Sequence, residues 1–229
     1  MANDKQKSRP QSGPSAMFVV VGLGNFGTTV ALELKRFGNH VIGIDQDERR
    51  VSDLAEELDQ AMILDARDEE ALREAGIQEC ATGLVAMGEN LEASVLSAMN
   101  LRLVGVDKVW AKATSRTHHR ILSRLGVDRV IHPEVDVGRQ IAQALHNPLV
   151  RDYVSLGNGY HVVNMRVPEA LTSKRISALK LEKYDLRCVG VMRGTKFVGD
   201  ASADCELQAD DLLLVLGRRS DLRSFASSL

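Results

Sequence analysis

The sequence predicts an α/β protein in which a doubly wound parallel sheet is followed by a smaller α+β domain. Short apolar runs of strand length alternate with amphipathic stretches from Met17 onward. A glycine-rich loop follows the first apolar run, and the alternation changes character after Asn147-Pro148. Apolar strands that are separated by helices are typical of parallel sheets buried on both faces.

Strict alternation of strand and helix is expected in the first part of the chain. The expected strands are 18–21, 41–44, 61–64, 83–86, 109–112 and 129–131. The expected helices are 26–37, 48–58, 68–75, 91–103, 118–125 and 134–145. The last helix ends before Pro148, because the residue preceding a proline disfavours helical backbone. We therefore place the first domain at 17–147, with the last helix as its crossover.

The second domain is expected at 148–229 and has the pattern of an α+β unit. Its expected strands are 162–167, 188–192, 196–198 and 212–216. Gly194-Thr195 separates two of these strands by two residues, which is typical of a β-hairpin. Residues 1–16 are polar and lack the apolar core of a signal peptide, so we expect a disordered tail there.

The composition is that of an ordinary globular protein. The 229 residues are 44% hydrophobic and 26% charged, and 29 basic against 31 acidic residues leave a formal net charge of −2. Without a long basic stripe, a nucleic-acid partner is not expected. The three cysteines are far apart and form neither a disulfide framework nor a CxxC motif, which fits a reducing cytoplasm. No run approaches the ~20 apolar residues of a membrane span, so work at a membrane would need a partner.

The loop Gly22-Leu23-Gly24-Asn25-Phe26-Gly27 directly follows a strand and opens a helix, which is the context of a Rossmann-like nucleotide site. The first glycine permits a tight turn, and the second lets a pyrophosphate approach the backbone. The third packs the helix on the strand, and the helix N-terminus offers unpaired N–H groups to the anion. A strand–helix turn without a ligand is the alternative interpretation.

Asp45 ends the second expected strand, 18 residues after Gly27. A carboxylate there can accept hydrogen bonds from both hydroxyls of an adenosine ribose and repel a 2′-phosphate. Adenine nucleotides without that phosphate are therefore the expected ligands. The alternative role of Asp45 is an N-cap for the next helix.

Ligands of such sheets lie beyond the carboxyl ends of the strands, which selects further candidates. They are Gln46, Asp47, Asp65, Ala66, Met87, Gly88, Glu89, Lys112, Ala113 and Thr114. Asp47, Asp65 and Thr114 could instead cap helices. Lys112 ends a buried strand and needs a partner, for which a nucleotide phosphate or Glu134 would serve.

The series GLGNFG, IDQD, LDARD, AMGEN, WAKAT and DRVIHPE resembles the regulatory RCK domains of potassium channels and transporters. The likeness is greatest to KtrA-type subunits of bacterial potassium uptake systems, followed by the TrkA type. It covers residues 17–229, because LQADDLLLVLGRRSDLRSF is similar to the end of the companion C-terminal RCK domain.

The resemblance implies a dimer that assembles into an octameric ring, binds ATP, ADP or NAD(H), and docks on a KtrB- or TrkH-like membrane subunit from the cytoplasmic side. It adds Asn25, His118 and Glu134 to the nucleotide contacts named above. It also implies that Glu134 can help to hold a divalent cation such as magnesium at the nucleotide phosphates. Glu134 could instead stabilise a helix N-terminus, and His118, next to His119, could be a surface residue.

Two further points follow from the same resemblance. KtrA-type proteins commonly carry an arginine where this chain has Asn25, so discrimination of ATP from ADP by that position is in doubt. Some members bind cyclic di-AMP in the C-terminal domain, and Arg166, Ile176 and Arg187 are of suitable type for such a site. Scattered arginines on a small domain are otherwise ordinary surface residues.

The main alternative function is an NAD-dependent oxidoreductase or an NADH redox sensor. A Tyr-x-x-x-Lys pair is missing, since Tyr153, Tyr160 and Tyr184 have no lysine four residues later. The chain also lacks a GxxxxGK[ST] loop for ATP hydrolysis, and no helix-turn-helix precedes the first strand. The sequence thus favours a regulatory protein that is not an enzyme.

Overall fold

The computed structural model describes residues 16–146, 149–200 and 204–228, so the expected disordered tail lies almost wholly outside the described residues. The chain divides into two compact units, Met1–Pro133 and Glu134–Leu229. This division assigns the whole of the last expected helix of the first domain, 134–145, to the second unit. The boundary near residue 147 remains a prediction. No helix in the described ranges is both long and apolar enough to cross a membrane.

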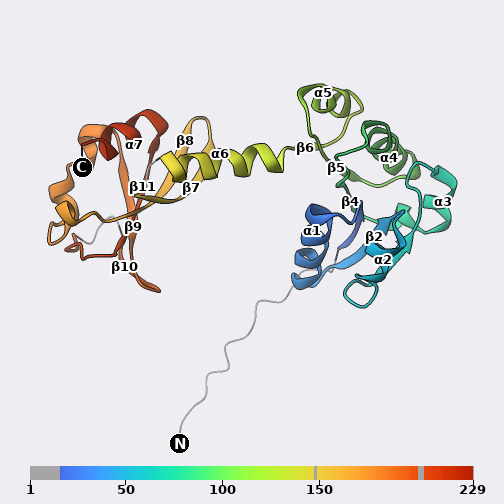
Figure 1. Ribbon diagram of the computed structural model, residues 1–229, viewed down its shortest axis with the longest axis horizontal. Helices are drawn as coiled ribbons and strands as arrows, with labels where there is room; N and C mark the ends of the chain where they lie inside the picture. Colours follow the sequence, from blue (N-terminus) through green and yellow to red (C-terminus); the bar gives the residue numbers. More distant parts are fainter. Residues whose placement is uncertain (1–15, 147–148, 201–203, 229) are drawn as a thin grey trace, which may run out of the picture. The chain divides into compact units, whose positions relative to one another are not determined.

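The first unit is built on a six-stranded parallel sheet, which confirms the predicted doubly wound architecture (Figure 1). Its strands are β1 (Met17–Val21), β2 (His40–Asp45), β3 (Gln60–Ile63), β4 (Thr82–Val85), β5 (Lys108–Lys112) and β6 (Arg129–Ile131). They lie in the order β3-β2-β1-β4-β5-β6. The order reverses between β1 and β4, and open α/β sheets bind ligands at such a switch point.

Helices cover both faces of this sheet, as the alternating core residues of β1 show. Val19 and Val21 belong to one buried cluster and Val20 to another on the opposite face. The helices are α1 (Asn25–Arg36), α2 (Glu48–Ser52), α3 (Glu69–Glu74), α4 (Leu91–Val104) and α5 (Arg116–Arg124), with a short 3₁₀ turn at Ile77–Glu79.

Two helices differ from their predicted ranges for local reasons. Helix α2 ends at Ser52 instead of residue 58, because the next backbone N–H groups bond three residues back, as in Leu54 to Val51. Helix α5 begins at Arg116 because the Ser115 hydroxyl accepts a hydrogen bond from the His118 N–H at 3.1 Å.

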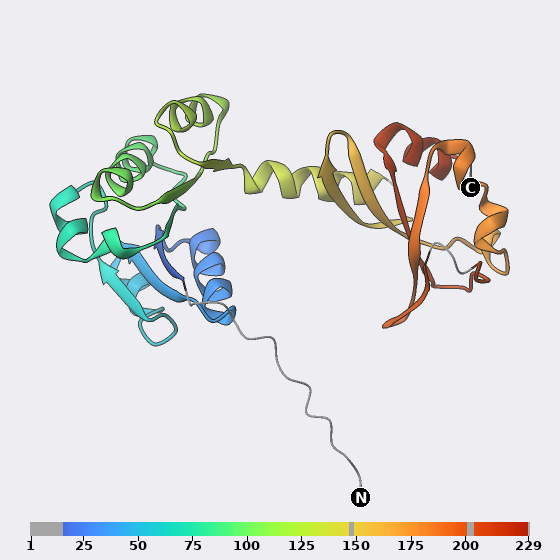
Figure 2. The same cartoon turned by 180° about the vertical axis from the view of Figure 1, so that it is seen from behind.

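The second unit contains a five-stranded antiparallel sheet, in agreement with the predicted α+β domain (Figure 2). Its elements are α6 (Pro133–His146), β7 (Val150–Gly157), β8 (Tyr160–Arg166), β9 (Arg187–Arg193), β10 (Lys196–Asp200), β11 (Leu212–Arg218), α7 (Arg219–Ala226) and three 3₁₀ turns, Glu169–Leu171, Ile176–Leu179 and Leu181–Tyr184. The strand order is β10-β9-β11-β8-β7.

The hairpins of this sheet show which turn signals could be recognised. The predicted turn at Gly194-Thr195 joins β9 to β10, with Arg193 paired to Lys196 and Gly194 at φ +58°. Strand β7 was not predicted, because most of its residues are exposed and it lacks a clear apolar alternation. It pairs with β8 through a tight turn in which Asn158 and Gly159 both have positive φ.

Candidate nucleotide-binding site

The three glycines of the loop after β1 occupy three different environments. Gly22 has φ +93°, a conformation that L side chains avoid. A Cβ on Gly27 would lie 1.9 Å from the Gly22 carbonyl oxygen, so the start of α1 packs directly on the loop. A Cβ on Gly24 would have no atom nearer than the Arg50 Nη1 at 4.0 Å. Gly24 therefore leaves open space above its backbone, as close approach of a pyrophosphate requires.

The N-terminus of α1 faces this space, and no acidic or capping side chain of the helix takes the place of an anion there. Gly24 is the N-cap residue, and no side chain caps the helix. The first turn of α1 holds no acidic residue, and Asn25 is exposed. The first N–H groups of a helix and its macrodipole together favour a phosphate at such a position.

Asp45 connects β2 to the glycine-rich loop. Its Oδ2 accepts a hydrogen bond from the Leu23 N–H at 2.7 Å, and its Oδ1 accepts one from the Asp47 N–H at 2.9 Å. The Asp45 side chain is 11% exposed. A carboxylate has about four lone-pair sites, and Arg50 Nη1 donates to a third at the long distance of 3.4 Å. One site is therefore free for a ribose hydroxyl, and a second becomes available if the ribose displaces Arg50. The expected ribose-binding position is thus next to the expected phosphate-binding loop.

Asp47 has the capping role that was the alternative to ligand binding. Its side chain accepts a hydrogen bond from the Arg49 N–H at 2.9 Å at the start of α2. The residue is exposed, as is its neighbour Gln46.

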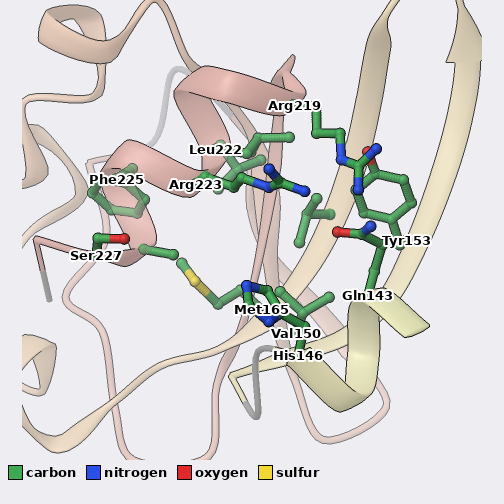
Figure 3. Close-up of a pocket in the computed structure, with 13 residues that line it drawn as sticks. Gln143, His146, Val150, Tyr153, Met165, Arg219, Leu222, Arg223, Phe225 and Ser227 are labelled. Carbon is green, nitrogen blue, oxygen red and sulfur yellow. The ribbon is translucent and has the colours of Figure 1, made fainter. Parts of the chain in front are cut away.

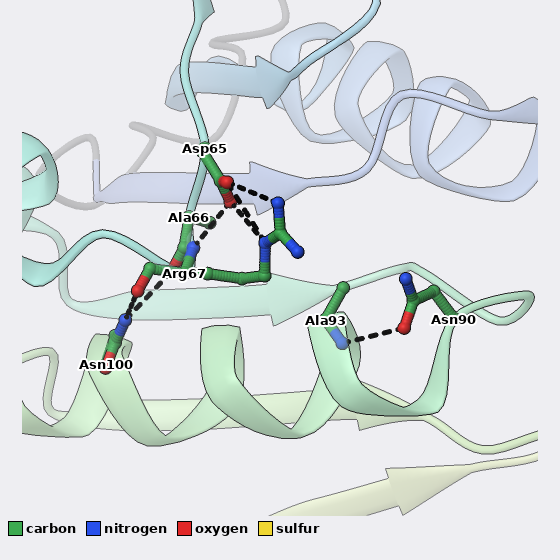
Figure 4. Close-up of polar contacts among 6 residues, drawn as sticks. All are labelled: Asp65, Ala66, Arg67, Asn90, Ala93 and Asn100. Carbon is green, nitrogen blue, oxygen red and sulfur yellow. Dashed lines mark hydrogen bonds and ion pairs between the residues drawn. The ribbon is translucent and has the colours of Figure 1, made fainter.

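Asp65, beyond the end of β3, is engaged by protein donors (Figure 4). Arg67 Nη2 lies 2.7 Å from Asp65 Oδ2, and the Arg67 backbone N–H donates to Oδ1 at 2.9 Å. The Arg67 hydrogen bond lowers the pKa of Asp65 against the opposing effect of burial, with a further hydrogen bond from Gln46. Asn100 Nδ2 holds the same turn by donating to the Arg67 carbonyl at 2.7 Å and to that of Ala66, which is buried.

The carboxyl ends of β4 and β5 converge on the glycine-rich loop. A Cβ on Gly22 would lie 2.8 Å from Met87 Cγ, and a Cβ on Gly88 would lie 3.6 Å from Lys112 Nζ. Lys112 Nζ is also 5.7 Å from the centre of the Phe26 ring, within cation–π range. The structure thus brings together, at the switch point, residues that the sequence separates by up to ninety positions.

The neighbouring candidates differ in what they expose. The Thr114 hydroxyl donates to the Gly88 carbonyl at 3.2 Å, whereas Ala113 is buried and contributes only backbone. Glu89 is exposed just before Asn90, whose side chain caps α4 by accepting from the Ala93 N–H at 3.0 Å (Figure 4).

His118 is not the surface residue that its polar surroundings in the sequence allowed. Its side chain is 1% exposed, and its Nε2 lies 3.1 Å from the hydroxyl of buried Ser94. Burial lowers the pKa of His118, so the neutral imidazole is favoured. His119 instead stacks on His132, with Nδ1 and Nε2 of the two rings 2.8 Å apart.

Glu134 begins the second unit and is exposed in the first turn of α6. Within the described ranges, no three His, Cys, Asp or Glu side chains are grouped so that they could hold a metal ion. A metal at Glu134 would therefore need ligands besides these side chains, such as nucleotide phosphates, and its role stays a prediction.

Two arginines at the site were not anticipated from the sequence. Arg50 Nη1 is 3.4 Å from Asp45 Oδ2, and its Nε is 3.7 Å from Asp47 Oδ2. Arg67 holds Asp65 as described above. The available signal was a basic residue within five positions of each strand-end carboxylate, which is too common on surfaces to be selective.

The fold and the site define a class: an α/β nucleotide-binding domain of the Rossmann type that is followed by a small antiparallel domain. A family model described as the TrkA-N domain matches residues 18–133. The chain belongs to the TrkA-N family, in the group that includes the Ktr system potassium uptake proteins. The resemblance inferred from the motifs is confirmed.

Two relatives support this assignment, and two solved structures share the fold. The Ktr system potassium uptake protein A of Bacillus subtilis is 32% identical over 91% of this chain and 94% of its own length. The protein of the same name from Vibrio alginolyticus is 31% identical over 93% and 97%. The GsuK channel bound to NAD shares the fold with a TM-score of 0.65 at 12% identity, over 95% of this chain and 40% of that one. The TrkA-N domain of Escherichia coli ybaL gives 0.52 at 18% identity, over 57% and 97%.

Proposed function

We propose that this chain is the nucleotide-sensing, non-enzymatic regulatory subunit of a Ktr- or Trk-type potassium uptake system. The single observation that carries the proposal is the position of Asp45. Its carboxylate accepts the Leu23 N–H at 2.7 Å and keeps an acceptor site free, beside a loop that leaves open space at Gly24. ATP and ADP are the proposed ligands, and NAD(H) has the same adenosine and pyrophosphate chemistry.

The proposed mechanism is a shift between two geometries of an assembled ring. ATP and ADP differ by one phosphoryl group and its charge, so only contacts that respond to this group can bias the equilibrium. Asn25 at the N-terminus of α1 and Lys112 beside Gly88 are the residues proposed to respond. A coupling free energy of about 1–3 kcal/mol would change the gating equilibrium about 5- to 150-fold.

The proposed assembly is a dimer that builds an octameric ring on the cytoplasmic face of a KtrB- or TrkH-like membrane subunit. The support is the relationship to Ktr proteins over nearly their full length. Helix α6 has no buried residues, and its apolar residues include Ile141 at 54% and Leu145 at 79% exposure, which suits a helix that packs against another subunit.

The first test is calorimetric titration of the nucleotide-free protein with ATP, ADP, NADH and NADPH, with light scattering to measure the assembly mass. We expect ATP and ADP to bind to a ring-sized assembly and NADPH to be rejected. Asp45→Asn should weaken ADP binding about 10- to 100-fold, because one or two charge-assisted hydrogen bonds are lost.

Glu48→Gln is the matched control for this variant. Glu48 is exposed at the start of α2, and its substitution removes the same charge three residues away from Asp45. The ADP affinity of this variant should therefore stay at the wild-type level. Unchanged ADP affinity in Asp45→Asn would refute the ribose assignment. A dimer that binds NADH strongly and ADP weakly would favour the redox-sensor alternative.

The proposed divalent cation is tested separately at Glu134. Glu134→Gln should leave nucleotide affinity in metal-free buffer nearly unchanged, because the substitution keeps the size of the side chain. It should abolish any increase of ATP affinity on adding magnesium. A variant that keeps the full magnesium effect would exclude Glu134 as a ligand.

A further inference from the structure

The second unit contains a cavity of about 270 Å³ that is separate from the glycine-rich loop (Figure 3). It lies between helix α7, the last turn of α6 and the face of the sheet formed by β7, β8 and β11. Its apolar wall includes Val163, Met165, Val215 and Phe225, all of them at most 4% exposed. Arg166, Ile176 and Arg187, the residues considered for cyclic di-AMP, do not line it.

Two arginines and a tyrosine give this cavity a polar side. Arg219 and Arg223 are one helical turn apart on α7, and Figure 3 shows their guanidinium groups on the same side of the cavity as the Tyr153 ring. Neither arginine has an ion pair with a carboxylate in the described part of the chain. The other acid-base and amide side chains on the lining are His146 and Gln143, both from α6, so no carboxylate is part of it.

The hydroxyl of Tyr153 is a second, independent observation that points to a ligand. It is buried, and no hydrogen-bond partner reaches it within the described residues. Burying a hydroxyl without a partner costs free energy, and phenylalanine would fill the same space without that cost. The Tyr153 ring lies 4.5 Å from the His161 ring, so it is held in place on β7. Burial raises the pKa of Tyr153 while Arg219 and Arg223 oppose this, so both cations act on the hydroxyl.

We propose that this cavity is a second effector site, for a small anion with an apolar body: a carboxylate or a phosphate monoester. Arg219 and Arg223 would bind the anionic group, and the Tyr153 hydroxyl would donate a hydrogen bond to it. The apolar body would lie against Met165 and Val215. The volume exceeds the roughly 150 Å³ of an apolar cavity that holds benzene and is near the lower limit of about 300 Å³ for small-molecule sites. This size fits a compact ligand and not a dinucleotide.

The test is calorimetric titration of the full-length protein with four probes. Octanoate and octyl phosphate carry the two candidate anionic groups on the same chain, 1-octanol lacks the charge, and inorganic phosphate lacks the apolar body. We expect at least one of the two amphiphilic anions to bind about tenfold or more tightly than 1-octanol and inorganic phosphate, because charge-assisted hydrogen bonds add to apolar burial. The ranking of octanoate against octyl phosphate identifies the preferred anionic group.

Variants locate the binding. Arg219→Gln and Arg223→Gln should each reduce the affinity for the preferred anion about tenfold and leave the affinity for 1-octanol unchanged. Tyr153→Phe should weaken binding of the anion. It should not lower the thermal stability of the protein, because it removes a buried hydroxyl that has no hydrogen-bond partner within the described residues. Arg218→Gln removes the same charge next to Arg219 but off the cavity lining, and it should bind like the wild type.

Two results would overturn the proposal. One is that neither amphiphilic anion binds better than 1-octanol. The other is that the loss in Arg219→Gln and Arg223→Gln does not exceed that in Arg218→Gln. Gly24→Ala separates this site from the nucleotide site, because its methyl group occupies the space where a phosphate approaches the glycine-rich loop. If this variant abolishes octyl phosphate binding, the probe is bound at the glycine-rich loop and the cavity is not the site.

Discussion

Two glycine-to-alanine substitutions, three residues apart in one loop, are expected to have opposite consequences. Gly24→Ala should abolish most nucleotide affinity and leave the fold stable. Gly27→Ala should destabilise the fold. The chemical change is the same, one methyl group, so each variant is the control for the other. The difference comes only from what each new Cβ would meet.

The distances around each Cβ position set the expected magnitudes. At Gly27 the methyl group would lie 1.9 Å from the Gly22 carbonyl oxygen, so the backbone of α1 or of the loop must move. Overpacking of this kind costs up to about 3 kcal/mol, which for a chain of this size lowers the Tm by about 6–12 °C.

At Gly24 the nearest atom would be 4.0 Å away, and φ is −73°, which alanine adopts without strain. Alanine is a poorer N-cap than glycine, but it also restricts the unfolded chain, so the net change in stability stays within about 1 kcal/mol. The methyl group would occupy the space where a phosphate approaches the backbone. Loss of a charge-assisted hydrogen bond there lowers the affinity for ADP about 10- to 100-fold.

The assay combines calorimetric unfolding with ADP titration on the wild type and both variants. Wild-type ADP affinity in Gly24→Ala would refute the inference that the pyrophosphate approaches this loop. A Gly27→Ala protein as stable as the wild type would refute the packing argument for the third glycine.

Two further predictions concern stability and reactivity. Burial alone would raise the pKa of Asp59, but hydrogen bonds from Lys35 and the Val41 N–H outweigh it and lower the pKa to about 2 from 3.8. Because the folded-state pKa is depressed, this carboxylate stabilises the fold fully above pH 3.8 and loses that contribution as the pH falls towards 2. Because solvent screens the ion pair of Asp59 with Lys35, the loss in the free energy of unfolding is about 1 kcal/mol. Urea unfolding at several acidic pH values should therefore show a shallower pH dependence of stability in Asp59→Asn than in the wild type. Burial raises the pKa of the Cys80 thiol to about 11, so iodoacetamide should leave Cys80 unmodified in the native protein and modify it in urea, as read by peptide mass spectrometry; native modification would contradict its burial.

Much of the fold could be predicted because its signals are local. The order of strands and helices in the first unit follows from apolar periodicity, and the hairpin at Gly194-Thr195 follows from its turn residues. Strand β7 could not be found this way, because an exposed strand carries no apolar alternation and is defined by its pairing with β8. The early end of α2 could not be predicted for a similar reason. After Ser52 the chain continues in turns with 3₁₀-type hydrogen bonds, and these turns bury the same side chains that a longer helix would bury.

The candidate site was predictable in outline but not in its contacts. The strand-end rule selects residues by their position in the chain, and the sheet order then gathers the ends of β1, β4 and β5. Whether a selected side chain remains available depends on its neighbours in space. Asp65 is held by Arg67, and His118 is turned inward to Ser94.

By itself, the sequence determined the fold class, the glycine-rich loop, the carboxylate at Asp45 and the family, since these depend on spacing along the chain. Only the tertiary structure decided which residues meet. It assigned a separate steric reason to each glycine, placed Lys112 beside Phe26, and formed the cavity beside Arg219 and Arg223. The physical reason is that burial, close contact and unpaired hydrogen-bonding groups arise between segments distant in the chain, and local periodicity carries no record of them.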